Sequence, residues 1–338
     1  MGCKALQASA LIPLLVLIVG CAGITPSSQN VVVKRAQLHM GTLVTITAAA
    51  SDQAVSHKAI QAGFDEVKRL EQLLSTWIPE SELSRVNAEA GRRPVTVSQE
   101  TLDLVVRSME MAGLTEGGFN IAVGPAVEAW SVTERQRIPS DEELQRLKPL
   151  VDVAGIQIDL DAQTIFLLHK GMKIDVGGIG KGYAADRAAE EMKKAGAQGG
   201  VVALSGDITT FGALPGAAGF PVGIKHPRKE GAMIAVIDLR DESISTAGDY
   251  ERFFEQDGVR YHHIFDPNSG LPAQGCQSVT IITGSVALGD ALATAVFVLG
   301  PEAGLQLLAQ YPDTEGLIVA ADGTLHPSPG WARYRVEQ

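Results

Sequence analysis

Residues 175 to 188 read DVGGIGKGYAADRA, so a carboxylate, four glycines and a lysine precede a stretch rich in alanine. Glycines let a backbone approach an anion closely, and the amides at a helix N-terminus attract phosphate. The two common phosphate motifs do not fit. Asp175 and Gly182 stand where a Walker A loop needs Gly and Ser or Thr, and Tyr183 stands where the dinucleotide fingerprint needs its last glycine. A tight turn in which Asp175 accepts backbone amides, and an anion cradle beside Lys181, both remain open.

Residues 289 to 300, GDALATAVFVLG, place Asp290 and Thr294 four residues apart on one face of a predicted helix. A hard cation such as Mg2+ takes a few oxygen ligands from the protein together with phosphate and water oxygens. This carboxylate and hydroxyl therefore suit half of a magnesium site. The alternative is structural, with Asp290 capping the helix and Thr294 bonding back to its own backbone.

Residues 260 to 272, RYHHIFDPNSGLP, carry two adjacent histidines before a proline-containing turn. Because neighbouring residues on a strand face opposite sides, only one of His262 and His263 can face a site. Near a phosphate that histidine can serve as a general base, and the alternative is a buried structural residue with satisfied hydrogen bonds. SGD at 205 to 207 and STAGDY at 245 to 250 are typical of capped turns.

Hydrophobic spacing predicts the elements that must position these side chains. Ile60, Phe64, Val67, Leu70 and Leu74 keep helical spacing and indicate a helix within 54–75. Further helices are predicted over 98–114, after Ser140, and over 181–195 and 286–299. Strands are predicted as two segments within 31–48, at 156–160, 164–168, 201–205, 235–239, 278–283 and 317–321, and as a segment ending at Asp175. Because strands often follow one another without a crossover helix, the pattern predicts an α+β fold with mostly antiparallel sheets flanked by helices.

The composition limits the class of protein. The 338 residues are 45% hydrophobic, which suits one large domain or two modest ones with a sizeable core. The formal net charge of −11 disfavours nucleic acid as a partner, so a nucleotide ligand needs a local cation. No internal repeat occurs, and nothing after residue 30 resembles a domain linker. We therefore expect a single domain over 31–338.

The N-terminus is typical of a bacterial lipoprotein. Lys4 precedes a short apolar run, Leu11 to Val19, which suits a secretory signal over 1–20 better than a membrane span. The sequence IVGC at 18–21 resembles a lipobox, in which Cys21 is acylated. An ordinary signal and a plain anchor helix are the alternatives. Residues 21–30 then form a tether, and we expect the folded domain to lie in the periplasm, attached to the cell envelope through the lipid. With Cys21 lipidated, Cys276 is the one free thiol left and no intramolecular disulfide is possible.

Eight motifs occur in one order: MGT (40–42), STW (75–77), FNIAVGP (119–125), DVGGIGKGYAAD (175–186), SGD, STAGDY, HHIFDPNSG (262–270) and GDALATAVFVLG. In this order they resemble the ApbE family, the FAD:protein FMN transferases, over about residues 38 to 300. The resemblance implies an ApbE-type fold related to the T-fold. It also implies a Mg2+-dependent reaction in which a Ser or Thr hydroxyl of an acceptor protein attacks the flavin-side phosphorus of FAD. AMP leaves and FMN stays attached through a phosphoester. The implied acceptor is an extracytoplasmic redox protein, such as a subunit of a membrane redox complex.

The resemblance also assigns residues. Gly178, through its carbonyl, and Asp290 and Thr294, through their side chains, match the metal ligands, and His263 matches the residue that activates the acceptor hydroxyl. The positions that match the lining of the FAD site are Met40, Trp77, Gly118, Phe119, Asn120, Asp175, Lys181 and Phe265. Among them, Trp77 and Phe119 are suited to stacking on rings.

Three positions depart from the family's pattern. Asn120 stands where Asp is usual, Gly289 where Ala is common, and Lys181 where some members have Glu. Asn120 can still form hydrogen bonds but carries no charge, and Lys181 can meet a phosphate. None of the three positions belongs to the metal pair.

Two other functions would use the same residues. With water as the acceptor, the site is that of an FAD pyrophosphatase that yields FMN and AMP. Without turnover, the chain is a flavin-binding lipoprotein. Flavin that stays on an acceptor protein after denaturation separates transfer from both alternatives.

Overall fold

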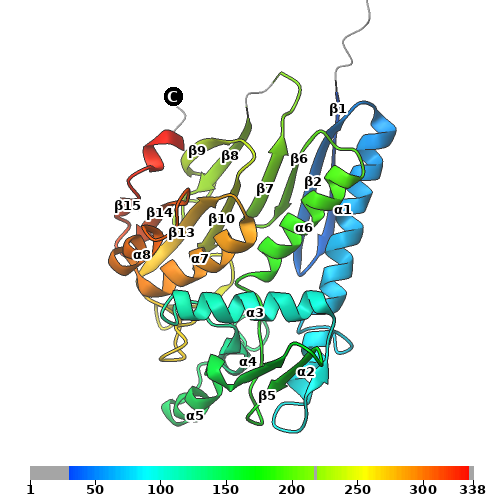
Figure 1. Ribbon diagram of the computed structural model, residues 1–338. Helices are drawn as coiled ribbons and strands as arrows, with labels where there is room; N and C mark the ends of the chain where they lie inside the picture. The colour runs from blue at the N-terminus through cyan, green and yellow to red at the C-terminus, as the bar shows by residue number, and fades with distance from the viewer. Residues whose placement is uncertain (1–29, 217–218, 335–338) are drawn as a thin grey trace, which may run out of the picture.

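The computed structural model describes residues 30–216 and 219–334 (Figure 1). The predicted signal at 1–20, the predicted lipid attachment site Cys21 and all but the last residue of the predicted tether lie outside these residues. Of the helices in the described part, none combines the length and the apolar character needed to span a bilayer.

One eight-stranded sheet forms the centre of the fold (Figure 1). Its strands run in the order β1-β2-β6-β7-β10-β13-β14-β15, and every neighbouring pair is antiparallel. The strands are β1 (Val31–His39), β2 (Thr42–Ala50), β6 (Gly199–Leu204), β7 (Asp207–Gly212), β10 (Ser243–Gly248), β13 (Cys276–Thr283), β14 (Glu315–Ala320) and β15 (Leu325–Pro327). The predicted α+β class with mostly antiparallel sheets is therefore confirmed.

Three smaller antiparallel sheets, β3-β5-β4, β8-β9 and β11-β12, complete the strands. They comprise β3 (Val95–Thr96), β4 (Ile156–Asp159), β5 (Thr164–Leu167), β8 (Phe220–Lys225), β9 (Met233–Leu239), β11 (Phe253–Gln256) and β12 (Val259–His262). The prediction of a strand ending at Asp175 is wrong. The amide of Asp175 donates to the carbonyl of Ile121 at 2.8 Å, so this segment bonds to the 3-10 helix η1 (Ile121–Val123) instead of joining a sheet.

The helices α1, α6 and α7 lie side by side over one face of the large sheet (Figure 1). The α-helices are α1 (Gln53–Leu74), α2 (Glu82–Ala88), α3 (Gln99–Leu114), α4 (Gly124–Trp130), α5 (Asp141–Leu147), α6 (Gly180–Lys194), α7 (Val286–Leu299) and α8 (Pro301–Leu308). Five of them begin after a side chain that accepts a first-turn amide, at Asp52, Ser81, Ser98, Ser140 and Ser285. Such caps satisfy amides that have no partner within the helix.

Small residues let α6 pack closely against its neighbours. Ala184, Ala185 and Ala188 are fully buried. At Gly182 a methyl group would lie 2.8 Å from the carbonyl carbon of Val286, which is closer than real packing allows. The start of α6 therefore lies directly against the start of α7, and the glycine-rich turn that precedes α6 is carried to the same place.

The opposite face of the sheet is also covered at its centre. Ile237 of β9, Ile282 of β13 and Trp331 of the 3-10 helix η4 (Trp331–Tyr334) belong to one buried cluster. Because α7 packs on the other face, all eight residues of β13 are buried. The strand beneath α7 thus gives that helix a fixed support.

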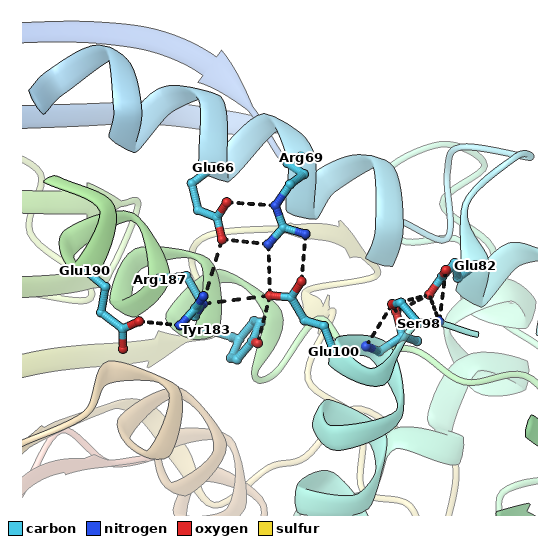
Figure 2. A network of polar contacts seen from close by, with 9 residues as sticks. Glu66, Arg69, Glu82, Ser98, Glu100, Tyr183, Arg187 and Glu190 are labelled. Carbon is cyan, nitrogen blue, oxygen red and sulfur yellow. Dashed lines mark hydrogen bonds and ion pairs between the residues drawn. The ribbon is translucent and has the colours of Figure 1, made fainter. Parts of the chain in front are cut away.

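A polar network joins the helices α1, α3 and α6 (Figure 2). Arg69 of α1 donates through Nε to Glu66 at 2.8 Å and through Nη1 to Glu100 of α3 at 2.7 Å. The hydroxyl of Tyr183 of α6 donates to Glu100 at 3.1 Å, and Arg187 lies 3.8 Å from both carboxylates. Because the groups come from α1, α3 and α6, the network holds the beginning of α6 in position.

Candidate active site

A cavity of about 720 Å³ lies where the β1–β2 turn, the glycine-rich turn before α6 and the face of α7 meet. All twelve residues predicted for the site line it: Met40, Trp77, Gly118, Phe119, Asn120, Asp175, Gly178, Lys181, His263, Phe265, Asp290 and Thr294. The fold therefore brings segments that are far apart in the sequence to one place.

The glycine-rich turn is held mainly by its own hydrogen bonds. Asp175 accepts the amide of Gly177 at 2.7 Å, as the turn hypothesis predicts. The amides of Ile179, Gly180 and Tyr183 also donate to nearby carbonyls, and that of Gly182 donates to Asp290 Oδ2 at 3.2 Å. Since most of its amides already have partners, the turn offers few N–H donors to an anion. Positive charge for a phosphate has to come from side chains or a bound cation.

Gly178 is placed directly beside α7. A methyl group at this position would lie 2.9 Å from Thr294 Oγ1 and 3.3 Å from the ring of Phe119. Glycine therefore keeps open the space next to the Thr294 hydroxyl, where the backbone of the turn and the side chains of α7 meet.

Lys181 lies between two carboxylates. Its Nζ pairs with Asp207 Oδ2 and lies 3.6 Å from Asp290 Oδ2, while Ser245 Oγ donates to Asp207 Oδ1 at 2.6 Å. Burial alone would lower the pKa of Lys181, but Asp207 and Asp290 outweigh it and raise that pKa above its usual value. Burial and the charge of Asp207 raise the pKa of Asp290 to about 7. Asp290 is therefore a buried carboxylate that a further cation would stabilise.

Gly178, Asp290 and Thr294 fit a hard cation. Asp290 lies in the second turn of α7, which Ser285 caps, so the alternative in which Asp290 caps the helix is wrong. Within the described residues, no group of three or more His, Cys, Asp or Glu side chains could hold a metal. A metal here would be bound by a mixed set of carboxylate, hydroxyl and carbonyl oxygens, which suits Mg2+ better than Zn2+.

The two histidines have different environments. His262 is buried, where its Nε2–H donates to the carbonyl of Ala273 at 2.7 Å and its Nδ1 accepts an amide. His263 lines the cavity, and its Nδ1–H donates to the carbonyl of Arg252 at 3.2 Å. That bond leaves Nε2 of His263 as the proton acceptor. Burial and the charge of Arg252 lower the pKa of His263 to about 3, so its imidazole is neutral at pH 7.

Comparison with known proteins identifies the family. The sequence model of the ApbE family matches residues 40–318. The chain belongs to the ApbE family. The FAD:protein FMN transferase of Treponema pallidum is 35% identical over 314 residues, which cover 88% of this chain and 86% of that protein. The FAD:protein FMN transferase of Klebsiella pneumoniae is 32% identical over 295 residues, or 86% and 90% of the two chains.

Solved structures of ApbE proteins share the fold. The ApbE protein of Thermotoga maritima has a TM-score of 0.85 at 31% identity and covers 91% of this chain and 100% of its own. The flavin transferase ApbE of Vibrio cholerae has a TM-score of 0.80 at 27% identity and covers 90% and 99%. The ApbE-type fold predicted from the motifs is therefore confirmed.

The geometry explains the asparagine in this ApbE protein. The Oδ1 of Asn120 accepts the amide of Ala122 at 2.7 Å, and its Nδ2 donates to the carbonyl of Val151 at 3.1 Å. An ionised aspartate could accept the first bond but could not donate the second. The residue that departs from the family's pattern is thus fixed by its own surroundings.

The aromatic residues divide into wall and rim. Phe119 and Phe265 are 2% and 5% exposed, so they form the cavity wall, whereas Trp77 is 65% exposed at its rim. Only Trp77 offers most of its ring to a ligand. Met40 lies in the β1–β2 turn with a φ of 50°, and its amide donates to Glu71 at 2.6 Å. Glu71 therefore fixes this part of the wall.

Two residues that line the cavity, Asp207 and Arg252, and Ser245, which donates to Asp207, were not predicted from the sequence as parts of the site. Asp207 and Ser245 belonged to motifs interpreted as capped turns, and Arg252 was not singled out. Asp207 opens β7 and is 2% exposed, and its carboxylate pairs with Lys181 of α6. A buried carboxylate needs a cationic partner. This requirement is the signal that could have paired Asp207 of the SGD motif with Lys181.

Proposed function

We propose that this ApbE-family chain transfers FMN from FAD to a serine or threonine hydroxyl of an acceptor protein, releases AMP and depends on Mg2+. One observation carries the proposal: every residue that the family pattern assigns to FAD, metal and proton transfer lines the same cavity. Curated relatives at 32–35% identity over most of the chain are FAD:protein FMN transferases.

In the proposed reaction the neutral imidazole of His263 accepts a proton at Nε2 from the acceptor hydroxyl. The hydroxyl oxygen forms a bond to the flavin-side phosphorus, and the bond from that phosphorus to the bridging oxygen breaks. AMP leaves with the bridging oxygen, and His263 returns its proton to solvent. The carbonyl of Arg252 holds the imidazole in the tautomer that this step needs.

Gly178, Asp290 and Thr294 would hold the cation. When bound, Mg2+ supplies positive charge that neutralises a pyrophosphate and a departing phosphate. The chain's own part is to hold these oxygen ligands in place and to keep the space beside them open. Asp290 accepts the amide of Gly182 at 3.2 Å and thereby keeps its position on α7, and the missing side chain at Gly178 keeps the space beside Thr294 free.

We propose further that the enzyme is lipid-anchored at Cys21 and acts on a redox protein outside the cytoplasm. The signal-like residues 1–20 and the lipobox support this location. Labelling with radioactive palmitate tests it: the full chain should incorporate label and the Cys21→Ser variant should not. An unlabelled wild-type chain would remove the anchor from the proposal.

The purified enzyme, FAD, Mg2+ and the extracytoplasmic domain of an envelope redox protein test the reaction. Flavin fluorescence that remains with the acceptor band in a denaturing gel, with one AMP released per flavin attached, is the expected result. Free FMN without flavin on the acceptor would indicate a pyrophosphatase. An FAD concentration that stays unchanged during a long incubation with a large excess of FAD over enzyme would indicate a binding protein without turnover. Asp290→Ala is the negative control because it removes a metal oxygen.

A further inference from the structure

Arg252 is a cavity-lining residue whose position is set by the candidate base. It lies in the loop between β10 and β11, and its carbonyl accepts both the backbone N–H and the Nδ1–H of His263, each at 3.2 Å. Its guanidinium reaches the opposite wall, where Nη2 lies 3.8 Å from the position of a methyl group on Gly41. The side chain therefore lies at the cavity mouth, between the base and the β1–β2 turn.

The charge of Arg252 opposes the rise that burial causes in the pKa of the Asp175 carboxyl, but no carboxylate that the structure describes forms an ion pair with the guanidinium of Arg252. Lys181, the other basic side chain of the lining, is paired with Asp207 and Asp290. Arg228 and Arg260, which are close to Arg252 in the fold, both pair with Asp249. Arg252 forms no ion pair with any carboxylate that the structure describes, so its guanidinium is available to an anionic ligand.

The amides of the glycine-rich turn offer an anion few N–H donors, because most of them donate within the protein. A cation held by Asp290 and Thr294 would lie on the α7 side of the cavity. Arg252 lies beside His263, whose Nδ1–H its carbonyl accepts. Arg252 can therefore add positive charge on the His263 side of a bound pyrophosphate.

We propose that the guanidinium of Arg252 binds the flavin-side phosphate of FAD, the phosphate that stays with FMN. This inference rests on the proposed function. The acceptor hydroxyl must reach His263 and the attacked phosphorus together, so the attacked phosphate lies beside the wall that carries His263. The fork of N–H donors on an arginine matches two phosphate oxygens, whereas a lysine provides a single point charge.

Binding of separate fragments tests the proposal without turnover. The dissociation constants of FMN, riboflavin and AMP are measured by calorimetry for the wild-type enzyme and for Arg252→Ala, Arg252→Lys and Arg92→Ala. Arg92 is a matched control, since it is also exposed and lies outside the cavity. We expect Arg252→Ala to weaken FMN about tenfold or more, the strength of a charge-assisted bond, and to leave riboflavin and AMP within about twofold. Arg252→Lys should recover part of the loss.

Three results would overturn the proposal. Equal weakening of FMN and riboflavin would mean that the arginine contacts the ring or shapes the cavity. Weakening of AMP alone would place it on the leaving side. Unchanged fragment binding with a raised KM for the acceptor would assign it to a carboxylate of that protein. A wild-type enzyme that binds none of the fragments would instead refute the proposed function, and this inference with it.

Discussion

Gly182 is the position at which the fold and the site depend on each other most closely. A methyl group there would contact the backbone of α7, with 2.8 Å to the carbonyl carbon of Val286 and 2.9 Å to Cα of Ala287. Backbone atoms cannot move aside as a side chain can. Gly182→Ala should therefore push α6 away from α7 and break the hydrogen bond from its amide to Asp290.

The expected loss of stability follows from these two contacts. Overpacking costs about 1–3 kcal/mol. Leaving the buried carboxylate of Asp290 without this amide costs about 1–3 kcal/mol more. About 300 ordered residues give an unfolding entropy of ~0.6 kcal/mol per degree. The two costs together, about 2–6 kcal/mol, therefore correspond to a Tm lower by about 3–10 °C. Because Asp290 also moves, we expect flavin transfer to fall about tenfold or more.

Calorimetry and the transfer assay measure both effects, with Gly113→Ala as the control. Gly113 is also helical, near the end of α3, and a methyl group there meets nothing within 4 Å. Since alanine favours a helix over glycine by about 1 kcal/mol, Gly113→Ala should leave Tm unchanged or raise it by about 1 °C. A Gly182→Ala enzyme with wild-type Tm and activity would refute the close approach of the two helices.

Three further predictions use other contacts. His263→Ala should reduce transfer about 100-fold or more and leave FAD affinity almost unchanged, because it removes the proton acceptor; equal rates in a stopped-flow assay would exclude His263 as the base. Cys276→Ala should transfer flavin at the wild-type rate. Because burial raises the pKa of this thiol to about 12, thiol reagents should inactivate the variant and the wild type at the same rate. The hydrogen bond from Arg69 lowers the pKa of Glu100 in the folded protein. Glu100 therefore stabilises the fold at pH values above the pKa that it has in the unfolded chain, and this stabilisation is lost as the pH falls through the pKa of the folded state. Glu100→Gln should therefore lower Tm at pH 7, and the difference from wild type should shrink near pH 4; a constant difference would contradict the ion pair.

The sequence predicted well those features that depend on local periodicity. The five apolar residues from Ile60 to Leu74 marked α1, and Ser98 and Ser140 marked the starts of α3 and α5. The i, i+4 spacing placed Asp290 and Thr294 on one face of α7, where both line the cavity. Short helices such as α2, α4 and α8 were missed because fewer than three turns give little periodic signal.

Contacts between distant segments could not be predicted from spacing. The pairing of Lys181 with Asp207 depends on how β7 is placed beside α6, and the exposure of Arg252 to the cavity depends on its bond to His263. The strand expected before Asp175 failed for the same reason, since its partner is η1 and not a sheet. The family pattern supplied the joint assignment of the site residues, which local pattern had left open.

The central claim is that Gly178, Asp290 and Thr294 surround one divalent ion beside the pyrophosphate of FAD. Crystals of the enzyme grown with Mn2+ and FAD test it directly through the anomalous signal of the metal. The account predicts one strong peak within about 2.0–2.3 Å of the Asp290 carboxylate, the Thr294 hydroxyl and the Gly178 carbonyl, in contact with phosphate oxygens. A peak elsewhere in the cavity, or flavin bound with no peak at these oxygens, would contradict it.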